Sequence, residues 1–128
     1  MIVVSTVGTQ DNIIIYLYNV EAAQFTQQPT NVISVSGRVS NVIANDFNQD
    51  NKVDFLVTYY NPEVQKYITS LFIQNADTDF LFTINNSLNI PKTKGEGSVM
   101  VADINGDTMY FLLKLVLISC FIQTELDI

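Results

Sequence analysis

The sequence predicts an all-β fold made of antiparallel sheets. Its apolar segments are short and rich in β-branched and aromatic residues, and Asn, Gly, Pro and Asp separate them. Such segments are typical of strands joined by turns. No segment before residue 109 repeats its apolar residues with the period of a helix. The succession of segments also occurs twice along the chain, which indicates a repeated unit.

Strands are expected in the apolar segments that lie between turn-forming residues. Each segment is too short for a helix of ordinary length but long enough for a strand. In chain order the segments are 2–4 (IVV), 13–18 (IIIYLY), 31–35 (NVISV), 55–60 (FLVTYY), 68–73 (ITSLFI) and 80–84 (FLFTI).

The repeat is visible when the two halves of the chain are aligned. IIIYLYN matches TSLFIQN, and SNVIANDFNQD matches GSVMVADINGD, which sets Asp46 and Asp103 57 residues apart. A unit of this length with about four short strands is typical of a propeller blade. We therefore predict about two blades of a β-propeller, with antiparallel four-stranded sheets, over residues 1–107. Because a closed ring needs about four to eight blades, we expect the chain to be a fragment of a longer propeller.

Composition limits the classes of function. The chain of 128 residues is 48% hydrophobic, which is sufficient to build the core of one domain. Its formal net charge of -7 argues against a nucleic-acid partner, because few Lys and Arg are available to neutralise phosphates. His is absent, and the single Cys120 therefore has no His to activate it as a nucleophile. We expect no enzymatic activity.

The segment DFNQDNKVD has the spacing of a calcium loop. Asp46, Asn48, Asp50 and Asp54 place side-chain oxygens at positions 1, 3, 5 and 9, and the backbone carbonyl of Lys52 at position 7 can add another. Calcium takes about six to eight oxygen ligands, which these residues and water would supply. Magnesium, which requires a stricter octahedron, is the second choice. Calcium is therefore the predicted cofactor.

The alternative to a metal site is a polar turn in which Asp and Asn side chains accept backbone N–H groups. In either case Asn51 at position 6 is expected to adopt a left-handed backbone, which Asn tolerates well. An EF-hand is excluded, because it needs Glu at position 12, where this chain has Val57, and helices on both sides. The second copy of the spacing favours calcium, with the main role of holding the loop and the register of the following strand.

The second copy of the loop is interrupted. Position 9 is Phe111, and an apolar segment occupies residues 108–123. If that segment is omitted, Asp127 takes position 9 and the pattern resumes over residues 124–128. The residues at positions 1, 3 and 5 are Asp103, Asn105 and Asp107. We expect these three and Asp127 to form a second metal loop if the segment is absent.

Three interpretations of residues 108–123 compete. A membrane span is disfavoured, because the apolar part is shorter than the roughly 18 to 20 residues required and contains Lys114. A natural loop insertion is disfavoured because surface insertions are usually polar. The preferred hypothesis is an unspliced intron or a similar error in the gene model.

The loops and their flanking strands resemble the integrin-alpha-type FG-GAP/VCBS repeats, whose calcium loops read DxNxDGxxD. Residues 46–54 and 97–107 carry this resemblance, and the strands extend it over most of residues 2–107. The sequences around the two loops are most similar to the T-cell immunomodulatory protein group; they are ANDFNQDNKVDFLVTYYN and VADINGD. The resemblance implies an extracellular propeller on a single-pass membrane protein of adhesion or signalling.

These observations lead to an expected function. We expect a calcium-stabilised propeller segment of a cell-surface protein that mediates adhesion or protein–protein interaction; the alternative is a secreted carbohydrate-binding or carbohydrate-active propeller. The expected partner is a protein ligand or cell-surface partner, on the extracellular side of a membrane. Membrane attachment would come only through regions missing from this chain. The sequon Asn85-Asn86-Ser87 makes Asn85 a candidate glycosylation site.

Overall fold

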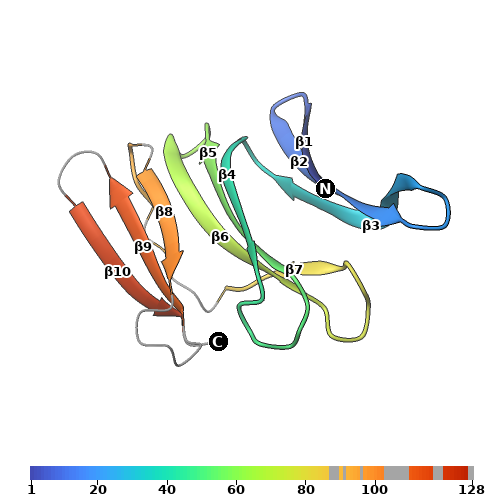
Figure 1. The fold of residues 1–128 in the computed structure, drawn as a ribbon. Helices are drawn as coiled ribbons and strands as arrows, with labels where there is room; N and C mark the ends of the chain where they lie inside the picture. Colours follow the sequence, from blue (N-terminus) through green and yellow to red (C-terminus); the bar gives the residue numbers. More distant parts are fainter. Residues whose placement is uncertain (87–89, 91, 96, 103–109, 117–119, 127–128) are drawn as a thin grey trace.

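The computed structural model describes all residues except 87–89, 91, 96, 103–109, 117–119 and 127–128. Its described part contains ten strands in three antiparallel sheets (Figure 1). Among the described residues, no helix has the length and apolar character that a membrane span requires.

The central sheet has four strands in the order β4-β5-β6-β7. These strands are β4 (Arg38–Asn45), β5 (Asp54–Asn61), β6 (Lys66–Gln74) and β7 (Phe82–Ile84). The first sheet has three strands in the order β1-β2-β3, namely β1 (Ile2–Val7), β2 (Gln10–Asn19) and β3 (Gln24–Val35). The third sheet has the order β10-β9-β8, with β8 (Gly97–Ala102), β9 (Tyr110–Val116) and β10 (Cys120–Leu126).

The first sheet repeats the last three strands of the central sheet. In both, each strand pairs in antiparallel fashion with the next strand along the chain, and Ile2 pairs with Ile15 as Leu56 pairs with Leu71. The predicted all-β class with antiparallel, blade-like sheets is therefore confirmed. The four-stranded form is present in the central sheet, whereas the described part of each outer sheet has three strands.

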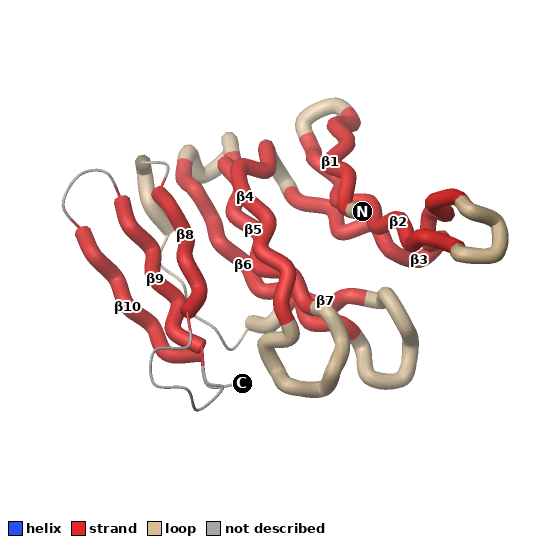
Figure 2. Tube along the Cα trace, viewed as in Figure 1, coloured by secondary structure: helices blue, strands red, loops and turns tan. Residues whose placement is uncertain are grey.

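Apolar side chains fill the space on both faces of the central sheet. One cluster joins it to the first sheet and consists of Ile13, Ile15, Ile33, Val35, Phe55 and Val57. A second cluster, on the opposite face, consists of Phe47, Leu56, Leu71 and Ile90, with Val101 of β8 packed against it. Alternation along β5 produces this division, because successive side chains of a strand point to opposite faces. The sheets are consequently stacked as layers (Figure 2).

Several strands depart from the predicted segments, and β8, β9 and β10 have no counterpart among them. β4 is absent from the expected set, because a register shift between Val39 and Asn41 interrupts the alternation that would have revealed it. β3 begins at Gln24, well before the predicted residue 31, although its first half is polar and contains Pro29. β3 lies at the edge of its sheet, where a proline is tolerated because one side of the strand is unpaired.

Within residues 108–123, the described residues 110–116 and 120–123 belong to the third sheet. β9 lies between β8 and β10, and its register sets Ala102 opposite Phe111. The division into residues 1–107, 108–123 and 124–128, and the hypothesis of an unspliced intron, stay predictions.

The turns lie at two opposite ends of the central sheet. The β5–β6 turn and the β3–β4 connection lie at one end with the β1–β2 turn, while the β4–β5 and β6–β7 loops lie at the other (Figure 1). An ion pair holds the first end together: Arg38 Nη1 donates to Asp11 Oδ1 at 3.0 Å. Asp11 is 4% exposed and also accepts Thr6 Oγ1 at 2.7 Å and Val39 N at 2.8 Å. The first sheet is thereby tied to the start of β4.

These contacts determine the pKa of the Asp11 carboxyl group. Burial alone would raise the pKa of its carboxyl group, but the hydrogen bonds from Thr6, Val39 and Arg38 and the charge of Arg38 outweigh it. The net effect lowers the pKa of Asp11 below its ordinary value of 3.8. Ionisation of Asp11 is therefore more favourable in the folded chain than in the unfolded chain, and ionised Asp11 stabilises the fold.

Replacing Asp11 with Asn tests this contribution. We expect Asp11→Asn to lower the free energy of unfolding near neutral pH by about 1–3 kcal/mol, because buried donors lose their charged acceptor. The stability difference from wild type should shrink as the pH falls below 3.8 and through the lowered pKa, where wild-type Asp11 becomes neutral as well. Urea unfolding from pH 7 to pH 2 measures it. The exposed Asp77→Asn is the control, and a pH-independent difference would contradict the assignment.

Candidate metal loop

The loop between β4 and β5 contains the predicted metal ligands and folds back sharply. Gln49 and Asn51 have left-handed backbones, with φ of 61° and 64°. The left-handed conformation expected for Asn51 is therefore confirmed. Non-glycine residues reach this region at some energetic cost, and Asn reaches it more readily than most residues.

Side chains of the loop accept hydrogen bonds from its own backbone. Asp46 Oδ1 accepts Asp50 N at 3.1 Å, and Asp46 Oδ2 accepts Asn51 N at 2.8 Å. Asp50 Oδ1 accepts Lys52 N at 2.9 Å, and Asp50 Oδ2 accepts Asn48 Nδ2 at 3.0 Å. Such contacts are typical of Asx turns and hold the polypeptide in the tight loop.

Asp54, at position 9, fastens the loop to the sheet. It is fully buried, its Oδ2 accepts Phe47 N at 2.9 Å, and its Oδ1 accepts Gln74 N at 2.9 Å. The carboxylate therefore links the start of the loop to the end of β6. Burial raises the pKa of Asp54; the backbone hydrogen bonds oppose this, and the nearby charge of Asp50 raises it further.

Lys52 reaches across to the neighbouring β6–β7 loop. Its Nζ donates to Asn75 O at 3.2 Å, to Ala76 O at 2.8 Å and to Asp79 Oδ1 at 2.8 Å. The sequence interpretation used only the backbone carbonyl of Lys52 and overlooked its side chain. A single Lys at a loop position carries no spacing that would reveal such a contact.

Gln74 is a second residue that the sequence interpretation overlooked. It is 4% exposed, its Nε2 donates to Val53 O at 2.9 Å, and its Oε1 accepts Phe80 N at 2.9 Å. One side chain thus satisfies backbone groups on both loops. The polar group is buried at low cost because both ends are hydrogen-bonded.

The donor set suits a hard cation, because its side chains supply only carboxylate and amide oxygens toward such an ion. Every carboxylate oxygen of Asp46, Asp50 and Asp54 already accepts a hydrogen bond, and Asp54 also accepts one from the backbone of Asn48. A carboxylate has about four lone-pair sites, so each of the three groups keeps some acceptor capacity. Among the residues that the structure describes, no three Asp, Glu, His or Cys side chains converge as a metal-ligand group. The loop therefore carries the predicted metal-ligand residues in the expected order. Their carboxylate oxygens accept hydrogen bonds, mostly from backbone N–H groups.

The remaining predicted site residues lie elsewhere. Asp103, Asn105, Asp107 and Asp127 lie outside the described residues. Asn85 follows β7 and is partly exposed, and its backbone N donates to Leu71 O at 2.8 Å. Ser87 of the sequon also lies outside the described residues.

Replacing Asp54 with Asn tests the fastening of the loop. One oxygen becomes an NH₂ group that faces a backbone N–H donor, so we expect a loss of about 1–3 kcal/mol in the free energy of unfolding. Urea unfolding measures the change, and Asp77→Asn, an exposed Asp→Asn replacement on the β6–β7 loop, is the matched control. Equal stabilities of the two variants would show that Asp54 does not hold the loop.

The comparison with protein families places the loop in a known repeat. The family model described as an FG-GAP-like repeat matches residues 46–109, which begin at the β4–β5 loop and include one whole repeat. Comparisons with curated proteins and with solved structures gave no match. The matched region is half of the chain and contains β5 to β8. Its strand order and its DxNxDNxxD loop agree with that match, and the chain belongs to the family of FG-GAP-like repeats.

Proposed function

We propose that the chain is a calcium-stabilised β-propeller segment of a cell-surface protein that mediates adhesion or another protein–protein interaction. The observation that carries the proposal is the tight loop of residues 46–54, which has Asp46, Asp50 and Asp54 at positions 1, 5 and 9 and is fastened to β6 through buried Asp54. Membership of the FG-GAP-like repeats supports a propeller role. Within that family we propose the T-cell immunomodulatory protein group as the most similar one.

Calcium would be held by oxygens of the loop itself. The ligands proposed are the side chains of Asp46, Asn48, Asp50 and Asp54 and the backbone carbonyl of Lys52. Asn48 donates its Nδ2 to Asp50 Oδ2 and accepts Asp50 N at its Oδ1, so an ion would share Oδ1 with that backbone contact. The ion would supply positive charge that removes the repulsion between neighbouring carboxylates. What supports this step is the proximity of Asp50 to Asp54: burial raises the pKa of Asp54, and the charge of Asp50 adds to that rise.

The proposed role of the ion is structural. Asp54 links the loop to β6, and Lys52 links it to the β6–β7 loop. An ion on the loop would therefore stabilise one whole end of the central sheet. Strands β4 and β5, which the loop joins, pack between the first sheet and β8, so their register affects the contacts on both faces.

We propose that in its parent protein the chain lies on the extracellular side of a membrane and binds a protein ligand or cell-surface partner. We also propose that Asn85 carries a glycan in that setting.

Calcium addition tests the stabilisation. Differential scanning calorimetry with calcium and with EDTA should give a higher Tm in calcium, by an amount that corresponds to about 2.7 kcal/mol at a calcium concentration 100 times Kd. Asp50→Asn removes one charged ligand and should abolish most of the shift, while Asp77→Asn should keep it. Magnesium should have a smaller effect, because it requires a stricter octahedron. Identical wild-type melts in calcium and EDTA would refute calcium binding.

Cell adhesion tests the interaction role. Beads that carry the chain should bind intact cells, EDTA should release them, and beads with Asp50→Asn should bind fewer cells at equal loading. Treatment of the cells with protease should abolish binding if the partner is a protein. Binding that survives protease but not glycosidase would instead establish the carbohydrate-binding alternative.

A further inference from the structure

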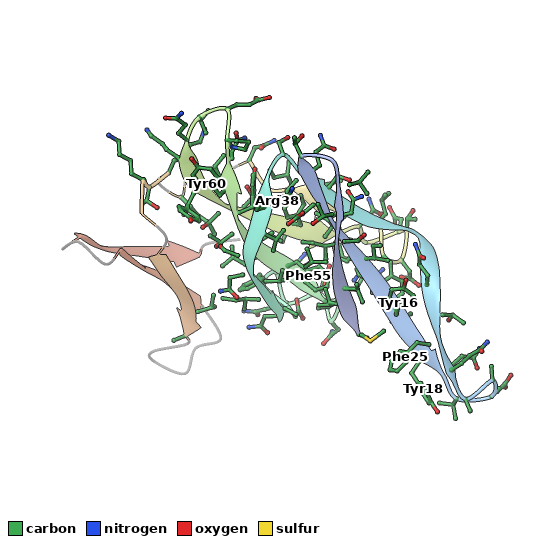
Figure 3. All side chains as sticks on the ribbon, turned by 90° about the horizontal axis from the view of Figure 1, so that it is seen from above. Tyr16, Tyr18, Phe25, Arg38, Phe55 and Tyr60 are labelled. Atoms are coloured by element: carbon green, nitrogen blue, oxygen red, sulfur yellow. The ribbon has the colours of Figure 1, made fainter. Side chains whose placement is uncertain are left out.

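A pocket lies at the end of the central sheet opposite the metal loop. It has a volume of about 310 Å³ and is lined by Thr9, Gly37, Arg38, Tyr60 and Pro62. These residues come from the β1–β2 turn, the β3–β4 connection, the start of β4, the end of β5 and the β5–β6 turn, so the pocket lies where the first sheet meets the central sheet. Figure 3 shows Arg38 and Tyr60 side by side at this end. The volume is at the lower limit of ligand pockets and suits one side chain or a small molecule.

The close approach of Gly37 to β5 shapes the pocket. Gly37 has φ of 156°, and a Cβ atom at this position would lie 1.8 Å from the backbone O of Tyr60. Only glycine permits this contact, because any side chain would overlap the carbonyl group. The β3–β4 connection therefore lies directly against β5 and forms one side of the pocket.

Arg38 is held in a fixed orientation beside the pocket. Its Nη1 donates to Asp11 at 3.0 Å and its Nη2 donates to Gly8 O at 3.1 Å, while its side chain remains 54% exposed. Guanidinium has five N–H donors, and these contacts use two of them. The remaining donors are available to a ligand, and the buried Asp11 limits the freedom that the side chain would lose on binding.

An aromatic wall stands beside this charge. Tyr60 packs against Tyr67 with ring centroids 5.2 Å apart and an angle of 59° between the rings. Pro62 completes an apolar surface that faces the same pocket as Arg38. Arg and Tyr are the residue types that most often dominate the energetics of protein interfaces. In the part of the chain that the structure describes, no acidic residue lines the pocket, although Asp11 pairs with Arg38 beside it and the whole chain has a net charge of -7.

We propose that this pocket binds a carboxylate-bearing residue of a protein partner. The carboxylate would accept hydrogen bonds from Arg38, because guanidinium matches carboxylate geometry, and the apolar part of the ligand would contact Tyr60 and Pro62. Arg38 is the only arginine in the chain, so this recognition cannot be shared with a second guanidinium. The inference rests on the proposed interaction function and deepens it by naming a site and the chemistry of the partner.

The test uses two probes that differ only in charge. N-acetyl-leucine carries a carboxylate, whereas N-acetyl-leucinamide replaces it with a neutral amide. Titration of the full-length ¹⁵N-labelled chain should shift the Arg38 Nε–H signal and the amide signals of Gly37 and Tyr60 in a saturable manner. The amide probe should bind at least about tenfold more weakly, since hydrogen bonds between charged groups are stronger than neutral ones. Equal binding of the two probes would overturn the proposal.

Variants locate the binding. Arg38→Gln should abolish binding of N-acetyl-leucine, and Arg38→Lys, which keeps the charge but lacks the planar fork, should weaken it at least several-fold. Asp77→Asn, on the opposite end, should leave it unchanged. If Arg38→Gln fails to fold because Asp11 loses its partner, Arg38→Lys and the comparison of the two probes on wild type still test carboxylate binding at Arg38. Shifts confined to other residues, undiminished binding to Arg38→Lys, or preference for methyl glycosides would overturn the proposal.

The outcome is separable from that of the proposed function. Calcium is expected at the loop of residues 46–54, whereas the probes are expected at the opposite end of the sheet. A calcium-dependent Tm and calcium-dependent adhesion without probe binding would refute the pocket alone. Probe binding at Arg38 without calcium-dependent melting would refute calcium stabilisation alone.

Discussion

Strand β5 buries both of its faces, and the rest of the structure is arranged around that constraint. Five consecutive residues, Asp54 to Thr58, are buried at the start of the strand. Phe55 and Val57 pack toward the first sheet, while Leu56 packs toward β8. A strand with two apolar faces cannot be exposed to water on either side, so sheets must stack on both. The repeated sequence supplies the strands that pack on each face, with β2 and β3 on one side and β8 on the other.

Two buried aspartates, Asp11 and Asp54, lie at opposite ends of the stacked sheets, and their carboxyl groups differ in pKa. Both accept backbone N–H groups, yet the pKa of Asp11 is lowered and the pKa of Asp54 is raised. Burial opposes ionisation of both carboxyl groups. At Asp11 the hydrogen bonds from Thr6, Val39 and Arg38, together with the charge of Arg38, outweigh it, whereas at Asp54 the backbone hydrogen bonds do not, and the anion of Asp50 adds to the rise. Arg38 therefore neutralises the charge of Asp11 at one end of the stack. An added cation would have most effect at the other end, beside Asp50 and Asp54.

The two ends also differ in what they offer a ligand. At the loop end, the oxygens of Asp46, Asp50 and Asp54 accept hydrogen bonds from the chain, and Lys52 connects this loop to its neighbour. At the turn end, Arg38 keeps free donors beside an aromatic wall. In the proposed scheme the loop end stabilises the segment and the turn end recognises a partner, so each role is confined to residues that the other does not use.

The sequence by itself determined the all-β class, the repeat, the strands with clear apolar alternation and the loop donors, because each of these depends on residues close together in the chain. β5 and β6 were predictable for that reason, and so was the left-handed Asn51. Only the tertiary structure decided the location of β4, whose bulge breaks the alternation, and the role of Gln74, which joins two loops. It also decided the pairing of Asp11 with Arg38 and the contact of Gly37 with Tyr60, because these residues meet only when two sheets stack.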